Sequence, residues 1–209
     1  MFFEYIPLIA SIAFMLLLAL VIPGPDFFMV VRQSLQYSRK TGIYTAIGLG
    51  LGIAVHITYC LAGIALIISK SILLFNIIKI TGAIYLFYIG FQVFLSKADD
   101  IEIKNFEKKQ DISSLMALKV GFLTNVLNPK ATLFFMSMFT VFIPEVTPNI
   151  ILAIISIVMI LMTIIWFICV SLFFTQPKVQ IVFNKFQKIF NKIFGGLLMA
   201  LGVKIAVYE

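Results

Sequence analysis

The chain has 209 residues, of which 62% are hydrophobic and 12% are charged, and its formal net charge is +7. Soluble domains average about 45–50% apolar and about 25% charged residues, so this composition excludes a water-soluble globular domain and a disordered chain. A transmembrane β-barrel is also excluded, because its strands alternate apolar and polar residues, whereas the run from Ile150 to Phe174 is apolar on every face. The fold class that remains is all-α, in a polytopic membrane protein.

Six apolar segments are long enough to span a bilayer, since a helix needs about 20 mainly apolar residues to cross the hydrocarbon core. They run from Tyr5 to Ile22, Thr41 to Ile68, Ile72 to Leu95, Val120 to Ile143, Ile150 to Phe174 and Ile193 to Tyr208. These spans fill one transmembrane domain, residues 1–209, and leave no room for a soluble catalytic domain. The first segment has no basic residues before it, so we expect a retained span and not a cleaved signal peptide.

The first span ends in Pro23-Gly24-Pro25-Asp26, which is followed by further apolar residues. Proline and glycine interrupt a regular helix, and non-helical backbone at membrane depth is tolerated only where protein buries it or where it lines a cavity. We therefore expect a broken helix, with Asp26 in the first turn of its second half. The alternative is a tight turn at the cytoplasmic surface, because Pro23 lies about 27 Å along a helix from Tyr5.

Small residues recur in the second span, where Gly48, Gly50 and Gly52 are spaced two apart. This spacing favours close helix packing, and a role in substrate passage is the alternative. His56, the only histidine, follows one turn later. Its usual titration range suits a proton relay, together with Asp26; the alternative is a histidine that is hydrogen-bonded inside the helix bundle.

Residues 96–114 form the longest predicted loop and divide the chain into halves of about 1–95 and 115–209, with three spans each. Because three is odd, two structurally related halves would have opposite orientations in the membrane. That inverted repeat is a common layout of transporters. The expectation rests on layout, since the halves share no strong sequence identity.

A second interruption lies in the fourth span, where Asn125 is followed by Asn128, Pro129 and Lys130. Pro129 lies about 15 Å beyond the interface expected near Lys119, hence near the midplane. Ionisable groups inside a membrane are rare, partnered and usually functional. The alternative is a kinked structural helix whose lysine reaches the interface with its long side chain.

Each half therefore contains one broken helix followed by a charged residue, a pattern that marks the binding site of many transporters. We expect Asp26 to pair with Lys130 in the empty site. A bound zwitterion would place its ammonium on Asp26 and its carboxylate on Lys130, while Asn125 and Asn128 orient it. Direct contact is a hypothesis, because the depths estimated for the two breaks differ by about 10 Å.

Residues 178–193 place apolar and basic side chains on opposite faces at helical spacing. This pattern predicts an amphipathic helix on the inner membrane surface, where anionic headgroups attract it. The alternative is an extension of the last span. Most of the 16 lysine and arginine residues lie in the connections after the first, third and fifth spans. The positive-inside rule makes these connections cytoplasmic and places both termini outside.

Three ordered motifs carry a family resemblance. The first is Pro23-Gly24-Pro25-Asp26, followed by Gly48, Gly50, Gly52 and His56. The second runs from Gly121 to Lys130, and the third from Gly195 to Gly202. Together they resemble the LysE/RhtB family of bacterial amino-acid exporters over nearly the whole chain. The resemblance implies a plasma-membrane carrier that exports amino acids or their derivatives and is driven by the proton gradient. The chain departs from the family at Phe27, where members often have asparagine.

Motifs for other chemistry are missing from the sequence. It has no phosphate-binding loop and no His-Glu-x-x-His or Cys-x-x-Cys motif, so we expect no ATP, no metal and no cofactor. Cys60 and Cys169 lie in apolar runs and are expected to be core residues. The expected partners are an amino acid, a coupling proton and the lipid bilayer, but not nucleic acid; whether the chain forms a homo-oligomer is left open.

Three rival functions remain. A metal-ion or other cation exporter would need several intramembrane carboxylates or thiolates. A membrane enzyme would need a second acid, base or nucleophile near Asp26, and the sequence offers none, so we do not expect an enzyme. A scaffold protein would explain the packing glycines but not Asp26 and Lys130.

Overall fold

The computed structural model describes residues 2–70, 72–96, 108–144 and 146–207. Within this part of the chain all regular structure is helical, which confirms the all-α class. The elements are η1 (Phe2–Tyr5), α1 (Ile6–Val21), α2 (Pro25–Gln36), α3 (Arg39–Lys70), α4 (Ile72–Leu95), α5 (Ser114–Val126), α6 (Pro129–Phe142), α7 (Asn149–Phe173) and α8 (Pro177–Val207). Most of the 96–114 loop and the predicted span end at Tyr208 lie outside the described residues.

Two of the expected spans are discontinuous. The chain leaves α1 at Val21 and begins α2 at Pro25, and it leaves α5 at Val126 and begins α6 at Pro129. With 13 and 14 residues, α5 and α6 are each about 20 Å long, too short to cross a core of about 30 Å alone. Both breaks were expected from the proline positions. Three stretches are long and apolar enough to cross a membrane: Phe3–Val21, which joins η1 to α1, Arg39–Gly63 in α3, and Asn149–Phe173, which is α7.

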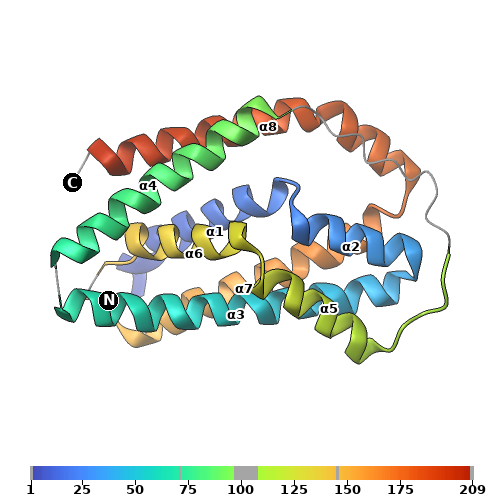
Figure 1. Cartoon of the computed structure of the whole chain (residues 1–209), viewed down its shortest axis with the longest axis horizontal. Helices are drawn as coiled ribbons and strands as arrows, with labels where there is room; N and C mark the ends of the chain where they lie inside the picture. Colours follow the sequence, from blue (N-terminus) through green and yellow to red (C-terminus); the bar gives the residue numbers. More distant parts are fainter. Residues whose placement is uncertain (1, 71, 97–107, 145, 208–209) are drawn as a thin grey trace.

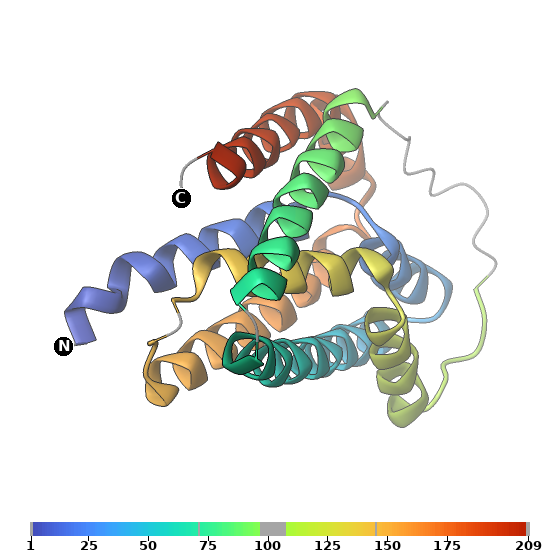
Figure 2. The same cartoon turned by 60° about the vertical axis from the view of Figure 1, so that its left-hand side comes forward.

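The two discontinuous helices run in opposite directions along the long axis of the molecule, and both breaks lie near its middle (Figure 1). Figure 2 shows the same arrangement from another side, with α4 and α8 packed together as a layer over the other helices. The helix α3 packs against α5 and α7 in the second layer. The breaks therefore lie at the centre of the fold.

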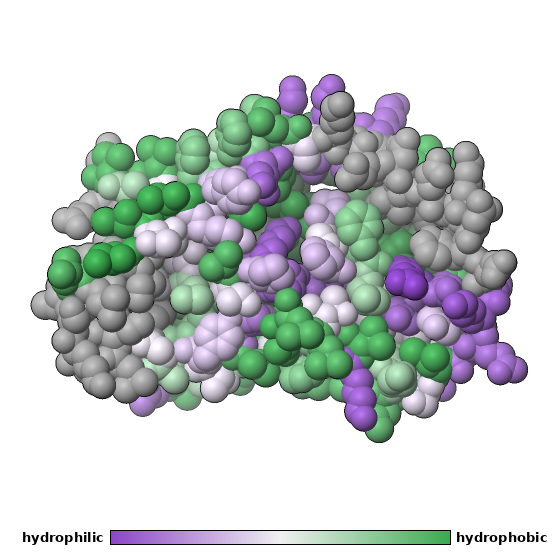
Figure 3. Space-filling model, viewed as in Figure 1, coloured by the Kyte–Doolittle hydropathy of each residue, from purple (hydrophilic) through white to green (hydrophobic). Residues whose placement is uncertain are grey.

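The polar connections gather at one end of the long axis. There the Arg39 side chain donates to Thr175 Oγ1 at 3.0 Å, and Thr41 Oγ1 donates to Asp111 Oδ1 at 3.1 Å, so the described parts of the three basic connections meet. Hydrophilic residues are concentrated at this end of the surface (Figure 3). The start of α1 and the end of α8 lie at the opposite end of the long axis (Figure 1).

The expectation of a separate helix on the membrane surface at residues 178–193 is wrong. The segment is the first half of α8, which continues without interruption to Val207. Its polar Gln187 and Asn191 are buried, whereas its apolar Phe186 and Ile189 are exposed. The outer face also carries the exposed Lys185, Lys188 and Lys192. Because α8 is one continuous helix, the alternative of an extended last span holds.

Glycines set the two closest helix pairs. A Cβ on Gly48 would clash with the Leu118 carbonyl of α5, and one on Gly121 would clash with the Thr45 carbonyl of α3. A Cβ on Gly52 would lie 2.7 Å from Asn125 Oδ1. The predicted packing role of the second-span glycines is confirmed, and it brings α3 directly against the second helix break.

The pair α4 and α8 allows a test with adjacent residues. A Cβ at Gly195 would lie 2.6 Å from the Gly90 carbonyl oxygen, whereas one at Gly196 meets nothing within 4 Å. We expect Gly195→Ala to lower the free energy of unfolding by about 1–3 kcal/mol through overpacking. Gly196→Ala is expected to be neutral or slightly stabilising, because alanine favours the helix by about 1 kcal/mol. Thermal unfolding in detergent measures both; equal effects would contradict the close α4–α8 packing.

Candidate functional site

The break between α1 and α2 exposes backbone carbonyls. Ile22 and Gly24 are both extended, and Pro25 occupies the first turn of α2. In a continuous helix the carbonyl of Ile22 would accept from the N–H of Asp26, but α1 ends at Val21, so this carbonyl lacks its helical partner. The end of α1 therefore presents an acceptor, while Asp26 lies in the first turn of α2, where the helix dipole stabilises a negative charge.

The second break is closed by a side-chain cap. Asn128 is the N-cap of α6, and its Oδ1 accepts a hydrogen bond from the backbone N–H of Lys130 at 3.0 Å. Pro129 follows at the first helical position, where its missing N–H costs nothing. Cap and proline together fix the direction in which α6 leaves the break, and so they position Lys130.

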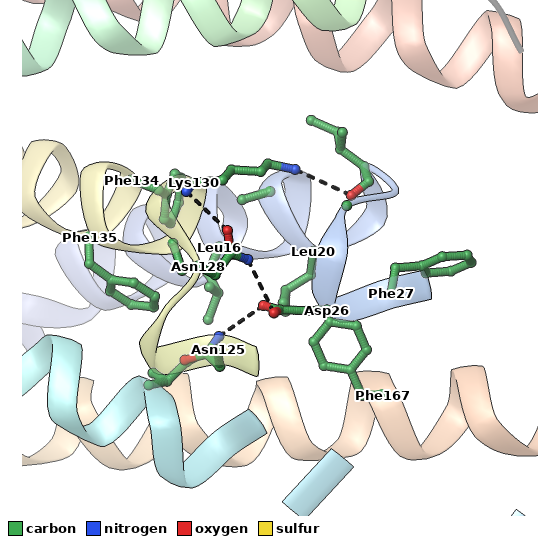
Figure 4. Close-up of a pocket in the computed structure, with 15 residues that line it drawn as sticks. Leu16, Leu20, Asp26, Phe27, Asn125, Asn128, Lys130, Phe134, Phe135 and Phe167 are labelled. Atoms are coloured by element: carbon green, nitrogen blue, oxygen red, sulfur yellow. Dashed lines mark hydrogen bonds between the residues drawn. The ribbon is translucent and has the colours of Figure 1, made fainter. Parts of the chain in front are cut away.

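The two breaks meet at Asp26. Its Oδ2 accepts a hydrogen bond from Asn125 Nδ2 at 2.8 Å, and its Oδ1 accepts one from Asn128 Nδ2 at 3.1 Å. Figure 4 shows both bonds crossing from the α5–α6 break to the start of α2. The depth difference estimated from the sequence is wrong, because counting helical rise requires the point at which each helix enters the membrane, and a sequence does not fix that point.

Lys130 does not pair with Asp26. Its Nζ lies 3.5 Å from the carbonyl oxygen of Ile22 and would lie 3.3 Å from a Cβ placed on Gly24. The ammonium is thus at the carboxyl end of α1, where the dipole favours a cation, and the two amides take both oxygens of Asp26. The expected ion pair is wrong in this conformation.

A small cavity of about 50 Å³ lies between the two charges, and its lining includes Asp26, Asn125, Asn128 and Lys130. Asn125 is 1% exposed, and its Oδ1 has no hydrogen-bond partner. That oxygen faces Gly52 of α3, because the amide directs its Nδ2 to Asp26. The carboxylate of Asp26 is therefore the acceptor that this cavity offers to an ammonium group. A water takes up about 30 Å³, so the cavity is large enough for one water molecule. It must widen to admit an amino acid.

Three comparisons with known proteins bear on this arrangement. The family described as LysE type translocator matches residues 17–209. The chain belongs to the LysE type translocator family. It is 32% identical to the uncharacterized membrane protein YrhP of Bacillus subtilis over 96% of this chain and 95% of that protein. It is 31% identical to the threonine efflux protein of Salmonella typhi, over 94% and 96%, and 29% identical to that of Escherichia coli K12, over 96% and 98%. No solved structure matches significantly.

Phe27 of the translocator forms an aromatic wall of the site. It is buried, and its ring centroid lies 4.9 Å from that of Phe174 and 5.8 Å from that of Phe183. These contacts join α2 to the junction of α7 and α8. Asparagine here would leave an amide among aromatic rings, so this translocator uses position 27 for packing.

His56 of the translocator lies behind the site. Its Nε2 is 3.0 Å from the backbone oxygen of Asn125, its Nδ1 is 2.6 Å from Tyr59 Oη, and its ring stacks on Phe135. This is the hydrogen-bonded histidine that was the alternative to a relay. Both ring nitrogens are occupied, so in this conformation His56 braces the last turn of α5.

The sequence did not indicate two features of the translocator's site. The Ile22 carbonyl is backbone, so no side chain signals it. The second feature is the double role of Asn128. The Asn-Pro pair signals its role as an N-cap, but no local pattern signals its hydrogen bond to Asp26. Within the described residues no group of three or more histidine, cysteine, aspartate or glutamate side chains lies together, so that part of the translocator has no cluster suited to a metal.

A double-mutant cycle tests the contact between the breaks. We expect Asp26→Ala and Asn125→Ala to be non-additive by about 0.5–3 kcal/mol in the free energy of unfolding, because they remove two ends of one hydrogen bond. The control is Thr124→Ala, since Thr124 bonds only the Val120 carbonyl of its own helix; its effect is expected to add to that of Asp26→Ala within about 0.5 kcal/mol. Additivity of the first pair would contradict the Asp26–Asn125 bond.

Proposed function

We propose that the translocator exports small amino acids, with threonine as the first substrate to test. Two of the relatives named above are threonine efflux proteins, and they cover nearly the whole chain. The observation that carries the proposal is the Asp26 carboxylate, held by Asn125 and Asn128 at the meeting point of two broken helices. An intramembrane acid in such a place is expected to bind substrate or ion.

In the proposed binding mode the substrate bridges the two charged residues. Its ammonium binds Asp26, while its carboxylate binds Lys130. The absence of a direct bond between Asp26 and Lys130 supports this assignment, because each charge is available to a group of opposite sign. Asn128 holds Asp26 and the start of α6 in register.

Transport by alternating access is proposed to use the breaks as hinges. Pro23, Gly24, Pro25 and Pro129 separate half-helices that are able to tilt independently, because among the described residues no backbone hydrogen bond joins α1 to α2 or α5 to α6. The halves 1–95 and 115–209 each contain one discontinuous helix, α1–α2 and α5–α6, and these run in opposite directions. This supports an inverted repeat, with the two halves rocking about the site.

Proton coupling is proposed to operate through Asp26. A carboxyl group that binds either a proton or the substrate ammonium exchanges one for the other, which is the simplest route to antiport. His56 is proposed to act as a relay only in a conformation that breaks its bonds to Tyr59 and to the Asn125 backbone. We also propose that the protein lies in the bacterial plasma membrane. The positive-inside rule favours an orientation with the basic end in the cytoplasm and both termini outside.

Efflux from loaded cells tests the substrate assignment. Cells loaded with a threonine-containing dipeptide are expected to release L-threonine faster with the protein than without it, and Asp26→Asn is expected to reduce that gain at least about tenfold, equivalent to 1.4 kcal/mol. The matched control is Asp111→Asn, which makes the same change at an exposed position at the polar end. No release of any amino acid in a panel of dipeptides would overturn amino-acid export.

The coupling ion is tested in proteoliposomes preloaded with labelled L-threonine. An acidic exterior is expected to accelerate efflux, because protons entering through Asp26 exchange for substrate leaving. A protonophore is expected to remove the acceleration. Efflux that ignores both the gradient and the protonophore would refute proton coupling and leave the exporter assignment intact.

A further inference from the structure

A second and wider cavity, of about 270 Å³, lies between the α1–α2 break, the end of α4 and the first half of α8. Its hydrogen-bonding side chains are those of Gln92, Ser96, Lys130, Gln187 and Asn191. Ser96 follows directly after α4, so the cavity extends from the breaks toward the polar end of the molecule. Figure 3 shows hydrophilic side chains reaching the surface between the α4–α8 layer and the rest of the fold.

Two uncharged polar side chains in the first half of α8 are buried. Gln187 is 3% and Asn191 is 5% exposed, although the neighbouring apolar side chains of α8 are exposed. Asn191 Nδ2 donates to Ser96 Oγ at 2.8 Å, whereas Gln187 Oε1 has no hydrogen-bond partner. Leaving a buried acceptor unpaired costs about 1–3 kcal/mol, and Gln187 is one of the residues that line the cavity, so its amide is suited to a ligand.

Lys130 belongs to both cavities. It lines the small cavity around Asp26 and the wide cavity beside Gln187, as do Ile22 and Gly24. Among the described residues that line the wide cavity, Lys130 is the charged one, so it gives this part of the lining a positive charge. A cation beside amide oxygens suits a ligand that carries a carboxylate and a hydrogen-bond donor.

We propose that the wide cavity is an access site for the amino acid, a second site that precedes the one at Asp26. The substrate's carboxylate binds Lys130 there, and its ammonium donates to Gln187 Oε1. When the small cavity widens, the substrate keeps its carboxylate on Lys130 and moves its ammonium from Gln187 to Asp26. This inference rests on the proposed function, from which it takes the substrate.

Binding of L-threonine to the purified, detergent-solubilised protein separates the two sites. We expect Asp26→Asn to abolish transport and to weaken threonine binding without removing it, because the access site is intact. Adding Gln187→Leu to that variant is expected to weaken binding at least about tenfold. Gln187→Leu alone is expected to raise KM with little change in kcat.

The matched control is Gln176→Leu, the same change at an exposed residue outside both cavities, which is expected to alter neither binding nor KM. Thermal unfolding checks that the variants are folded. Loss of threonine binding in Asp26→Asn, or equal binding by that variant with and without Gln187→Leu, overturns the access site and leaves the exporter assignment standing. A wild-type protein that neither binds nor exports threonine overturns both.

Discussion

The structure depends on one buried carboxylate that is held by neutral partners. Asp26 accepts hydrogen bonds from two asparagines that belong to the opposite discontinuous helix, so the two breaks are fastened to each other at the centre of the fold. An amide satisfies the hydrogen-bonding capacity of a carboxylate without cancelling its charge. The acid therefore remains able to bind a cation, and the same bonds that join the two halves of the chain create the site for one.

The dipoles of the half-helices explain where the charges lie. Asp26 occupies the first turn of α2, and Lys130 reaches the carboxyl end of α1 at the Ile22 carbonyl. Each charge is stabilised by the helix end of opposite sign, so the two charges are held apart without pairing. Separated charges match an amino acid, whose ammonium and carboxylate are themselves separated, better than an ion pair would.

Packing around the breaks is uneven, and this follows from the glycines. The contact of α3 with α5 is so close that Gly52 touches Asn125, and His56 of the same helix holds the Asn125 carbonyl. The α4–α8 pair is equally close within itself, but a wide polar cavity separates it from the α1–α2 break. The side of the site formed by α3 and α5 is therefore closely packed. The side that faces α4 and α8 has room for substrate and for movement of these two helices.

The sequence by itself determined the membrane class, the helices and both breaks, because hydropathy and the proline and glycine positions are local properties. It also identified Asp26, Asn125, Asn128 and Lys130, since polar groups inside apolar runs stand out. Tertiary structure decided what these groups touch: two helix ends distant in sequence meet, the amides take the acid, and the lysine turns to a backbone carbonyl. Tertiary structure also buried Gln187 and Asn191. The amphipathic pattern of this segment does not state which of its faces packs against the rest of the protein. Contacts between segments about 100 residues apart depend on how helices pack, and no local pattern encodes that.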